Sequence, residues 1–203
     1  MAIIHPTTLT PGKLELLGEW LPRQDWYRSH AGQANLTRAG GFRLDDPAGE
    51  VGIEFMVVLD VSGEADRADA DAGATAYLVP LTYRGSALPD ADDALIGTAE
   101  HGVLGQRWIY DGTRDPVLLA TLAAFIAGRA QAQAQRVSDT PDPTVLSAPV
   151  AAAPGEPLDF RFERVLVPAD GEQPAPGQVT ATWTGSDGSV VRGIFVTSQR
   201  AQG

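Results

Sequence analysis

The sequence contains no cysteine, and this absence excludes several kinds of chemistry at once. Disulfides, thiol nucleophiles, thiolate zinc sites and iron–sulfur clusters all require that side chain. Lysine occurs once, as Lys13, and the three histidines, His5, His30 and His101, lack the spacing of metal ligands. No apolar run approaches the roughly 20 residues that span a bilayer, and the N-terminus lacks the features of a signal peptide. We therefore expect a cytoplasmic protein without a metal site.

Motifs that carry catalysis or hold cofactors are also missing. No glycine-rich loop ends in Gly-Lys-Ser/Thr, no Gly-x-Gly-x-x-Gly follows a strand, and no Gly-x-Ser-x-Gly occurs. The acidic run from Glu64 to Asp71 starts like a calcium loop, but Pro80 stands where the twelfth-position Glu is needed. We predict a non-catalytic chain without a cofactor. An enzyme of unrecognised type stays an alternative, because distant carboxylates can converge in space.

Acidic charge is concentrated in one part of the chain. Residues 45–100 carry thirteen acidic residues against two arginines, which equals the net charge of −11 of the whole sequence. Such a block repels phosphate backbones and anionic membranes, so we expect neither nucleic acid nor a membrane as partner. A solvated acidic surface is the simplest interpretation. Arginine-rich usage with little lysine suggests a bacterial source of high G+C content.

Patterning predicts helices and strands in the first two thirds. A short helix is expected after Thr10 as N-cap, with its only lysine facing solvent and its end set by Pro22. Apolar, β-branched runs predict strands at 51–61, 74–83 and 103–110, and Pro80 predicts an edge position or a bulge for the second. A second helix is expected from Asp115 to about residue 132.

The last third is predicted as a proline-rich segment followed by strands. Residues 137–157 contain five prolines and no periodicity, which indicates a tether or an extended surface segment. Strands are expected at 158–167, 178–184 and 189–197, the last two joined by a hairpin turn at 185–188. This order predicts an α+β fold, with a mostly antiparallel sheet and helices packed on one face.

Aromatic residues and arginines gather after the first helix. Two Trp, one Tyr and two Arg lie within Trp20–Arg28, and these residue types dominate protein interfaces. Arg23, Trp26, Tyr27 and Arg28 are therefore the candidate interaction surface. The alternative is a helix end whose rings pack back onto the core.

Several segments resemble the N-terminal cap of maltokinases. Residues 17–27, Leu-Gly-Glu-Trp-Leu-Pro-Arg-Gln-Asp-Trp-Tyr, are similar to the opening of these sugar kinases, although the Lys that usually follows is absent. Residues 77–81, Tyr-Leu-Val-Pro-Leu, resemble a strand of the cap, and residues 94–97 and 108–112 match the order of later motifs. Residues 115–126 resemble the closing helix.

The resemblance implies a curved, cystatin-like sheet and a setting in maltose, trehalose and α-glucan metabolism. It implies a cap-like domain at 1–136, followed by the connecting segment at 137–157. The strands at 158–203 either complete the sheet or form a separate hairpin, and we expect completion because an isolated hairpin is marginally stable in water. Kinase lobes are not recognisable, so we expect a stand-alone cap. The first hypothesis is a binding or regulatory module that docks on a kinase, on another enzyme of glucan metabolism or on itself. The second is a small-molecule or sugar-binding protein that uses the concave face, with Trp108 or Trp183 as lining residues.

Overall fold

The computed structural model describes residues 9–28, 34–62, 74–135, 137, 139–150, 156–169, 171 and 173–201. Its α-helices are α1 (Lys13–Trp20) and α2 (Pro116–Ile126), and its 3-10 turns are η1 (Leu21–Arg23), η2 (Asp92–Ala94) and η3 (Gly112–Arg114). The strands are β1 (Leu9–Thr10), β2 (Leu36–Asp45), β3 (Gly52–Asp60), β4 (Thr75–Arg84), β5 (Leu95–His101), β6 (Gly105–Asp111), β7 (Gln133–Ala134), β8 (Leu146–Ser147), β9 (Leu158–Phe162), β10 (Val165–Leu166), β11 (Gln178–Thr184) and β12 (Val190–Arg200).

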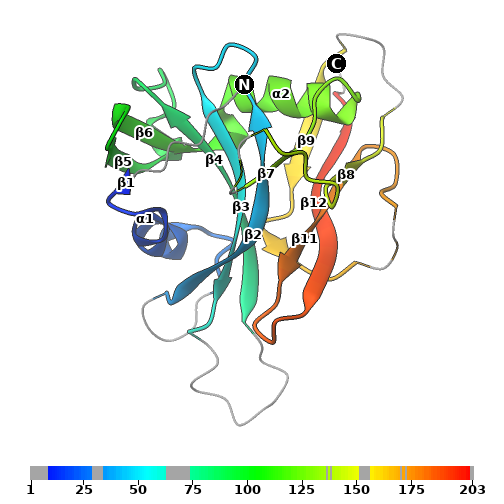
Figure 1. Cartoon of the computed structure of the whole chain (residues 1–203), viewed down its shortest axis with the longest axis horizontal. Coiled ribbons are helices and arrows are strands. Elements are labelled where there is room, and N and C mark those ends of the chain that lie inside the picture. The colour runs from blue at the N-terminus through cyan, green and yellow to red at the C-terminus, as the bar shows by residue number, and fades with distance from the viewer. Residues whose placement is uncertain are drawn as a thin grey trace.

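All these strands belong to one sheet, whose main order is β1-β5-β6-β4-β3-β2-β11-β12-β9 (Figure 1). Every pairing in the described part of the chain is antiparallel, which confirms the mostly antiparallel sheet expected from the sequence. β3 and β4 pair over nine residues without a register shift. The segment that joins them falls largely at 63–73, outside the described residues.

One part of the sheet, from β4 through β3, β2, β11 and β12 to β9, closes on itself, and we call it the closed half-sheet. β9 pairs with β12 at one end of this part, and β10, which follows β9 directly, pairs with β4 at the other end. Backbone hydrogen bonds continue the closure between them, from Glu163 N–H to the Phe195 carbonyl and from Leu78 N–H to the Arg164 carbonyl. The run 158–167 is thus two strands rather than the single predicted one, because its two halves bond to different neighbours.

The helices lie on opposite faces of the central strands, so the prediction of helices on one face is wrong. Side chains alternate along β3: Phe55 and Val57 enter the main core with α2, whereas Met56 and Val58 enter the second core with α1. Both faces of β3 and β4 are apolar, so a helix packs against each of them, α2 on one face and α1 on the other. Figure 1 shows α1 to one side of β3 and β4, and α2 across the space between β3 and β12.

The first helix begins two residues later than predicted, at Lys13. Thr10 lies in β1 and pairs with Glu100 of β5, so it is not the N-cap. Gly12 takes that position, and its N–H donates to the side chain of Glu15 at 3.2 Å. The helix ends at Trp20, and Pro22 lies in the 3-10 turn that follows, as expected for a residue that cannot extend a helix.

The second helix begins as predicted but ends earlier. Asp115 is its N-cap and accepts a hydrogen bond from the Val117 N–H, and Pro116 is the first helical residue. At the other end, Gly128 has a φ of 71°, and the N–H groups of Gly128 and Arg129 bond to the carbonyls of Phe125 and Ala124. This glycine-dependent cap stops the helix at Ile126, not near residue 132.

The prediction for Pro80 is also wrong, because β4 is a central strand without a bulge at this residue. Pro80 pairs with Phe55 of β3 in an unshifted ladder. The other flank of β4 is shared: β10 pairs with Tyr77 and Ala76, and β6 pairs with residues 81–84. The proline thus lies in the interval between two partner strands, where a missing N–H removes no ladder bond.

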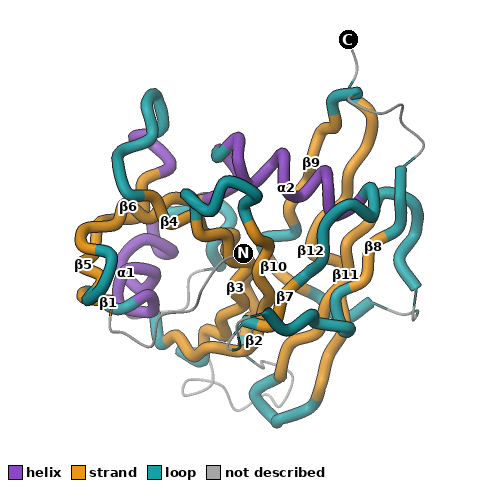
Figure 2. The backbone as a smooth tube through the Cα atoms, turned by 45° about the horizontal axis from the view of Figure 1, so that its top comes forward, coloured by secondary structure: helices purple, strands orange, loops and turns teal. Residues whose placement is uncertain are grey.

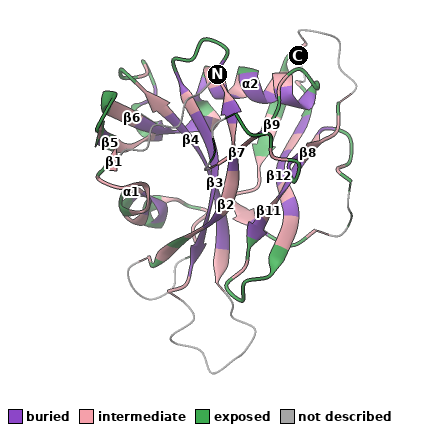
Figure 3. Ribbon diagram, viewed as in Figure 1, coloured by how far each residue is buried: buried purple, intermediate pink, exposed green. Residues whose placement is uncertain are grey.

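The proline-rich segment adds to the sheet instead of running free of it. β2 and β11 pair only at Gly40 and Trp183, and where they separate β7 pairs with β2 and β8 pairs with β11. Val145 is buried in the main core just before β8. In Figure 3 the burial is greatest along the central strands, and Figure 2 shows the loops that connect β7 and β8.

Candidate interaction surface

The candidate interaction surface starts where α1 turns back toward the sheet. After α1, the 3-10 turn buries Leu21, and the side-chain amide of Gln24 donates to the Trp20 carbonyl at 3.2 Å. The Tyr27 N–H then donates to the Gln24 carbonyl at 2.9 Å. These two hydrogen bonds reverse the chain, so that Trp26 and Tyr27 return to the sheet.

Four aromatic rings meet at this point, and we refer to Trp20, Trp26, Tyr27 and Tyr77 as the aromatic cluster. The Trp26 ring lies 5.8 Å from Trp20 in an edge-on arrangement and 6.0 Å from Tyr77, and Tyr27 lies 5.4 Å from Tyr77. Tyr77 belongs to β4 and is fully buried, whereas Trp26 and Tyr27 are half-buried. The rings therefore pack on the second core, which was the alternative interpretation of the sequence.

Hydrogen bonds fix the tyrosines of the cluster. The Tyr27 hydroxyl donates to Asp60 Oδ2 at 2.5 Å, and Asp60 Oδ1 accepts from the N–H groups of Asn35 and Ser62. Burial raises the pKa of Tyr27, and the Asp60 charge raises it further. Burial alone would raise the pKa of Asp60, but the hydrogen bonds from Tyr27 and Ser62 hold it below its usual value. Tyr27 therefore stays a neutral donor to a carboxylate.

An arginine from the C-terminal part of the chain holds the other side of Trp26. The guanidinium carbon of Arg164 lies 5.0 Å from the centre of the Trp26 ring, a cation–π geometry. The same guanidinium pairs with Asp111 and donates to Thr113 Oγ1 at 3.1 Å. Trp26 thus contacts both Tyr77 and Arg164, which limits the freedom of its half-buried side chain.

The four residues selected from the sequence are placed differently. Trp26 and Tyr27 both contact Tyr77, and the backbone of Arg28 joins them, because its N–H donates to the Tyr77 hydroxyl at 3.1 Å. Arg23 and Arg28 have exposed side chains. Within the described ranges, neither of these two side chains has a hydrogen-bonding or ionic partner. We call Arg23, Trp26, Tyr27 and Arg28 the Trp26 surface.

The residues that support this surface were not identified from the sequence. The sequence indicates Tyr77 only as part of the segment 77–81, and it does not predict that the Tyr77 hydroxyl bonds to the backbone of Arg28. Asp60 and Arg164 lie far from Trp26 in the sequence, and a single Asp or Arg gives no sign of which residue it will contact. The sequence alone therefore could not identify these two supports.

A second polar cluster surrounds a buried carboxylate on the α1 face. Glu54 of β3 accepts from Lys13 at 2.5 Å, Arg38 at 2.9 Å, and both Tyr83 and Gln135 at 2.7 Å. Its side chain is only 4% exposed. The only lysine of the chain is therefore paired, and the expectation that it faces solvent is wrong. We call these five residues the Glu54 cluster.

Other carboxylates also serve structural roles. Asp115 is fully buried and accepts from Nε and Nη2 of Arg84, at 2.7 and 2.6 Å, in addition to capping α2. Asp46 accepts from three backbone N–H groups of the β2–β3 loop. No cluster of three or more His, Asp or Glu suited to a metal occurs among the residues that the structure describes. The acidic run from Glu64 to Asp71 lies outside them.

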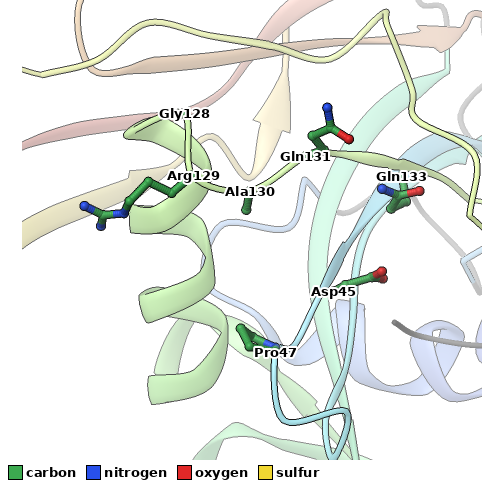
Figure 4. Close-up of a pocket in the computed structure, with 7 residues that line it drawn as sticks. All are labelled: Asp45, Pro47, Gly128, Arg129, Ala130, Gln131 and Gln133. Carbon is green, nitrogen blue, oxygen red and sulfur yellow. The ribbon is translucent and has the colours of Figure 1, made fainter.

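The concave side of the closed half-sheet is filled by side chains. Trp183, which was expected as a lining residue for a sugar, is 5% exposed and packs on Phe195 inside the main core. Trp108 is half-buried against the small cluster around Tyr110. A hollow of about 390 Å³ lies elsewhere, between the C-terminal end of α2 and the strands β2 and β7 (Figure 4). No α-helix in the described ranges is long and apolar enough to cross a membrane.

Residues 20–115 match the family model of the maltokinase N-terminal cap domain. The resemblance expected from the segments 17–27, 77–81 and 108–112 is thereby confirmed. The matched part begins at Trp20 and ends at Asp115, so it includes the aromatic cluster but not Arg164 or α2. A search of curated proteins finds no match to the chain.

Proposed function

We propose that this chain, which contains a segment matching the maltokinase N-terminal cap domain, is a non-catalytic binding or regulatory module of maltose, trehalose or α-glucan metabolism. It docks through the Trp26 surface on another protein, either a kinase or another enzyme of that metabolism, or on a second copy. The matched segment, residues 20–115, supports the metabolic setting.

The geometry of Trp26 is the observation that carries the docking proposal. Its ring contacts Tyr77 and Arg164, and the residue is half-buried rather than enclosed in the core. A ring that is already fixed loses little conformational entropy on binding. Arg23 and Arg28, before and after it in the chain, present exposed guanidinium groups. Trp, Tyr and Arg are the residues that most often dominate binding energy at interfaces.

The non-catalytic part of the proposal is supported by the roles of the buried carboxylates. Glu54, Asp60 and Asp115 each accept several hydrogen bonds that tie one element to another. Each of the three has its pKa held below the usual value by these donors, although burial alone would raise it. A general acid or base needs the opposite, a pKa moved toward neutrality and a side chain open to substrate.

Docking is tested with a charge-reversal variant. Arg23 and Arg28 are exposed, so we expect the double variant Arg23→Glu/Arg28→Glu to keep the fold. The wild-type chain is expected to capture a specific partner from an extract of its source cells. The variant is expected to lose this partner. Arg161→Glu is the control, since Arg161 of β9 is also exposed and lies outside the matched segment. Light scattering of the purified chain shows whether the partner is a second copy.

Two results contradict the proposal. The first is that the wild type and Arg23→Glu/Arg28→Glu capture the same proteins while light scattering shows a monomer. This result would show that the Trp26 surface is not a docking site. The second is phosphate transfer from ATP to maltose by the purified chain, or any other turnover that survives repurification. Such activity would show that the chain is an enzyme.

A further inference from the structure

One border of the sheet has no neighbouring strand. The main strand order ends at β1, which has two residues, and at β9, which has five. β9 pairs with β12 on one side in an unshifted register. The closed half-sheet continues from β9 to β4, but β4 bonds there only to Arg164 and β10, and its residues 81–84 pair with β6. In the described part of the chain, β9 therefore has a free edge.

Three residues of β9 direct their backbone groups to this edge. The Glu163 N–H bonds to β12, whereas the Arg164 carbonyl accepts from β4. Successive residues of an antiparallel strand bond to opposite sides, so the odd-numbered residues of β9 face β12. The N–H and carbonyl groups of Leu158, Phe160 and Phe162 point the other way. Within the ranges that the structure describes, none of these groups has a hydrogen-bond partner.

The charges on this edge are complementary to those of a second copy of the same strand. Asp159 and Arg161 stand one residue before and one residue after Phe160, and both side chains are exposed. Among the described residues Asp159 has no hydrogen-bonding or ionic partner, and Arg161 pairs with Glu163 at 2.6 Å. In an antiparallel pair centred on Phe160, each Asp159 lies opposite an Arg161, whereas like charges in these positions would repel. Edge strands that stay single usually carry a proline, a bulge or repelling charges, and β9 has none of these.

The apolar side chains of the edge are not fully covered. Leu158, Phe160 and Phe162 are half-buried, and the two Phe rings lie 6.5 Å apart. Both rings pack against the main core from its border. A strand added at the edge covers more of this apolar surface, and that burial favours pairing.

We propose that β9 is a dimerisation edge, which pairs antiparallel with β9 of a second copy and is centred on Phe160. The two Phe160 residues exchange both of their N–H···O bonds, and Leu158 of each copy does the same with Phe162 of the other. Asp159 and Arg161 of the two copies form the non-hydrogen-bonded pairs, in which opposite side chains are closest. Both copies thus use the same residues, as a two-fold axis requires.

The small size of the contact determines its strength. Permanent dimers usually bury about 2,000 Å² or more, which a pair of five-residue strands does not reach. We therefore expect a reversible dimer that dissociates on dilution. The edge is separate from the Trp26 surface, because β9 packs on the main core and the aromatic cluster packs on the second core.

Sedimentation equilibrium of the full chain over a concentration series tests the dimer. Asp159→Arg and Arg161→Glu each place like charges opposite each other, and we expect each to raise the dimer Kd by about tenfold or more. The swapped variant Asp159→Arg/Arg161→Glu restores opposite charges, so its Kd is expected within about threefold of the wild type. Glu100→Arg is the matched control, since Glu100 of β5 is also exposed, and it is expected to keep the wild-type Kd.

Two sedimentation results overturn the proposal. One is a wild-type chain that stays monomeric at hundreds of micromolar. The other is a swapped variant that is folded, as judged by thermal melting, but dimerises no more tightly than the two single variants.

Amide hydrogen exchange of the wild type, followed by NMR, locates the contact without any variant. The amides of Leu158, Phe160 and Phe162 are expected to exchange at least about tenfold more slowly in a concentrated sample than in a dilute one. Those of Asp159 and Arg161 bond to β12 and are expected to be protected in both samples. A dimer in which the three even-numbered amides exchange equally fast at both concentrations forms elsewhere, and this result overturns the assignment of the edge.

Two variants separate this proposal from docking at the Trp26 surface. Arg23→Glu/Arg28→Glu is expected to dimerise like the wild type, and Arg161→Glu is expected to lose the dimer while it still captures the partner of the Trp26 surface. A dimer that is lost in Arg23→Glu/Arg28→Glu but kept in Arg161→Glu would assign self-association to the Trp26 surface and overturn the role of β9.

Discussion

Removing the charge of Glu54 is the sharpest test of how the α1 face is held together. Glu54 lies in β3 and is 4% exposed at its side chain, where it binds Lys13 of α1 and Arg38 of β2. Tyr83 of β4 and Gln135 beyond β7 donate to the same carboxylate. One charge therefore joins four separate parts of the chain, and Glu54→Gln keeps the shape of the side chain while removing that charge.

The expected loss follows from the burial of the pair. Breaking a buried ion pair by removing one partner costs about 3–5 kcal/mol, because the remaining charges lose their compensation. Here Lys13 and Arg38 remain, with side chains 33% and 27% exposed, so solvent offsets part of the cost and the lower end of the range applies. For a chain of 203 residues, about 3 kcal/mol corresponds to a Tm lower by roughly 6–12 °C.

The pH dependence distinguishes a charge effect from a packing effect. Burial alone would raise the pKa of Glu54, but Lys13, Tyr83 and Arg38 hold it below its ordinary value. A group whose pKa is lower in the folded state stabilises the fold fully above its unfolded pKa, and this contribution is lost as the pH falls through the folded pKa. The stability gap between wild type and Glu54→Gln is therefore largest near pH 7 and narrows below about pH 4.

Urea denaturation followed by fluorescence between pH 7 and pH 3 measures both quantities. Glu100→Gln is the control, since Glu100 of β5 is exposed, and it is expected within about 0.5 kcal/mol of wild type. A Glu54→Gln variant as stable as Glu100→Gln at pH 7, or a gap that does not narrow in acid, would refute the assigned role of the Glu54 charge.

Two further sets of substitutions probe the fold. Asp115→Ala removes the α2 N-cap and the buried partner of Arg84, so we expect the free energy of unfolding in urea denaturation to fall by about 3–5 kcal/mol. Loss of a cap alone costs roughly 1 kcal/mol. A decrease of only that size would show that the ion pair adds nothing. Gly41→Ala should cost at least about 2 kcal/mol, because φ is 126° and an added Cβ would lie 2.0 Å from the Phe55 carbonyl oxygen. Gly18→Ala in α1 meets nothing within 4 Å and should gain about 0.5–1 kcal/mol, and equal Tm changes for the two glycines would contradict the packing described.

Elements with a strong local pattern could be predicted from the sequence. β3 and β4 are runs of β-branched and aromatic residues buried on both faces, and α2 has a clear cap in Asp115 and Pro116. The turn at 185–188 is typical of a hairpin, and β11 and β12 pair across it. In these segments local preference and tertiary packing favour the same structure.

Elements that depend on their neighbours could not be predicted. β2 contains Gly40 and Gly41, which weaken its strand pattern, and only its last four residues, where Phe42 and Leu44 alternate with charged residues, favour a strand. Its place is fixed by β3 on one side and by Trp183 and β7 on the other. β5, with a Gly and a Glu in a short run, is fixed in the same way by β6.

The candidate sites show the same limit. Arg23, Trp26, Tyr27 and Arg28 are adjacent in the chain, and their composition alone made them candidates. The residues that support them are far away in the chain: Asp60, the partner of Tyr27, is 33 residues away and lies in β3. Arg43 and Gln133 are likewise brought together only by the β2–β7 ladder, and the two-residue strand β7 has no pattern of its own.

The residues after the matched segment complete its core. Phe42 stacks on Phe55 with ring centres 4.5 Å apart, and both lie within residues 20–115. Phe42 also packs against Phe125 of α2 at 6.3 Å and Phe195 of β12 at 6.0 Å, which lie beyond it. The matched segment thus has an apolar face that only the later elements cover. Its other face carries α1 and the aromatic cluster, and the Trp26 surface that we propose for docking lies there.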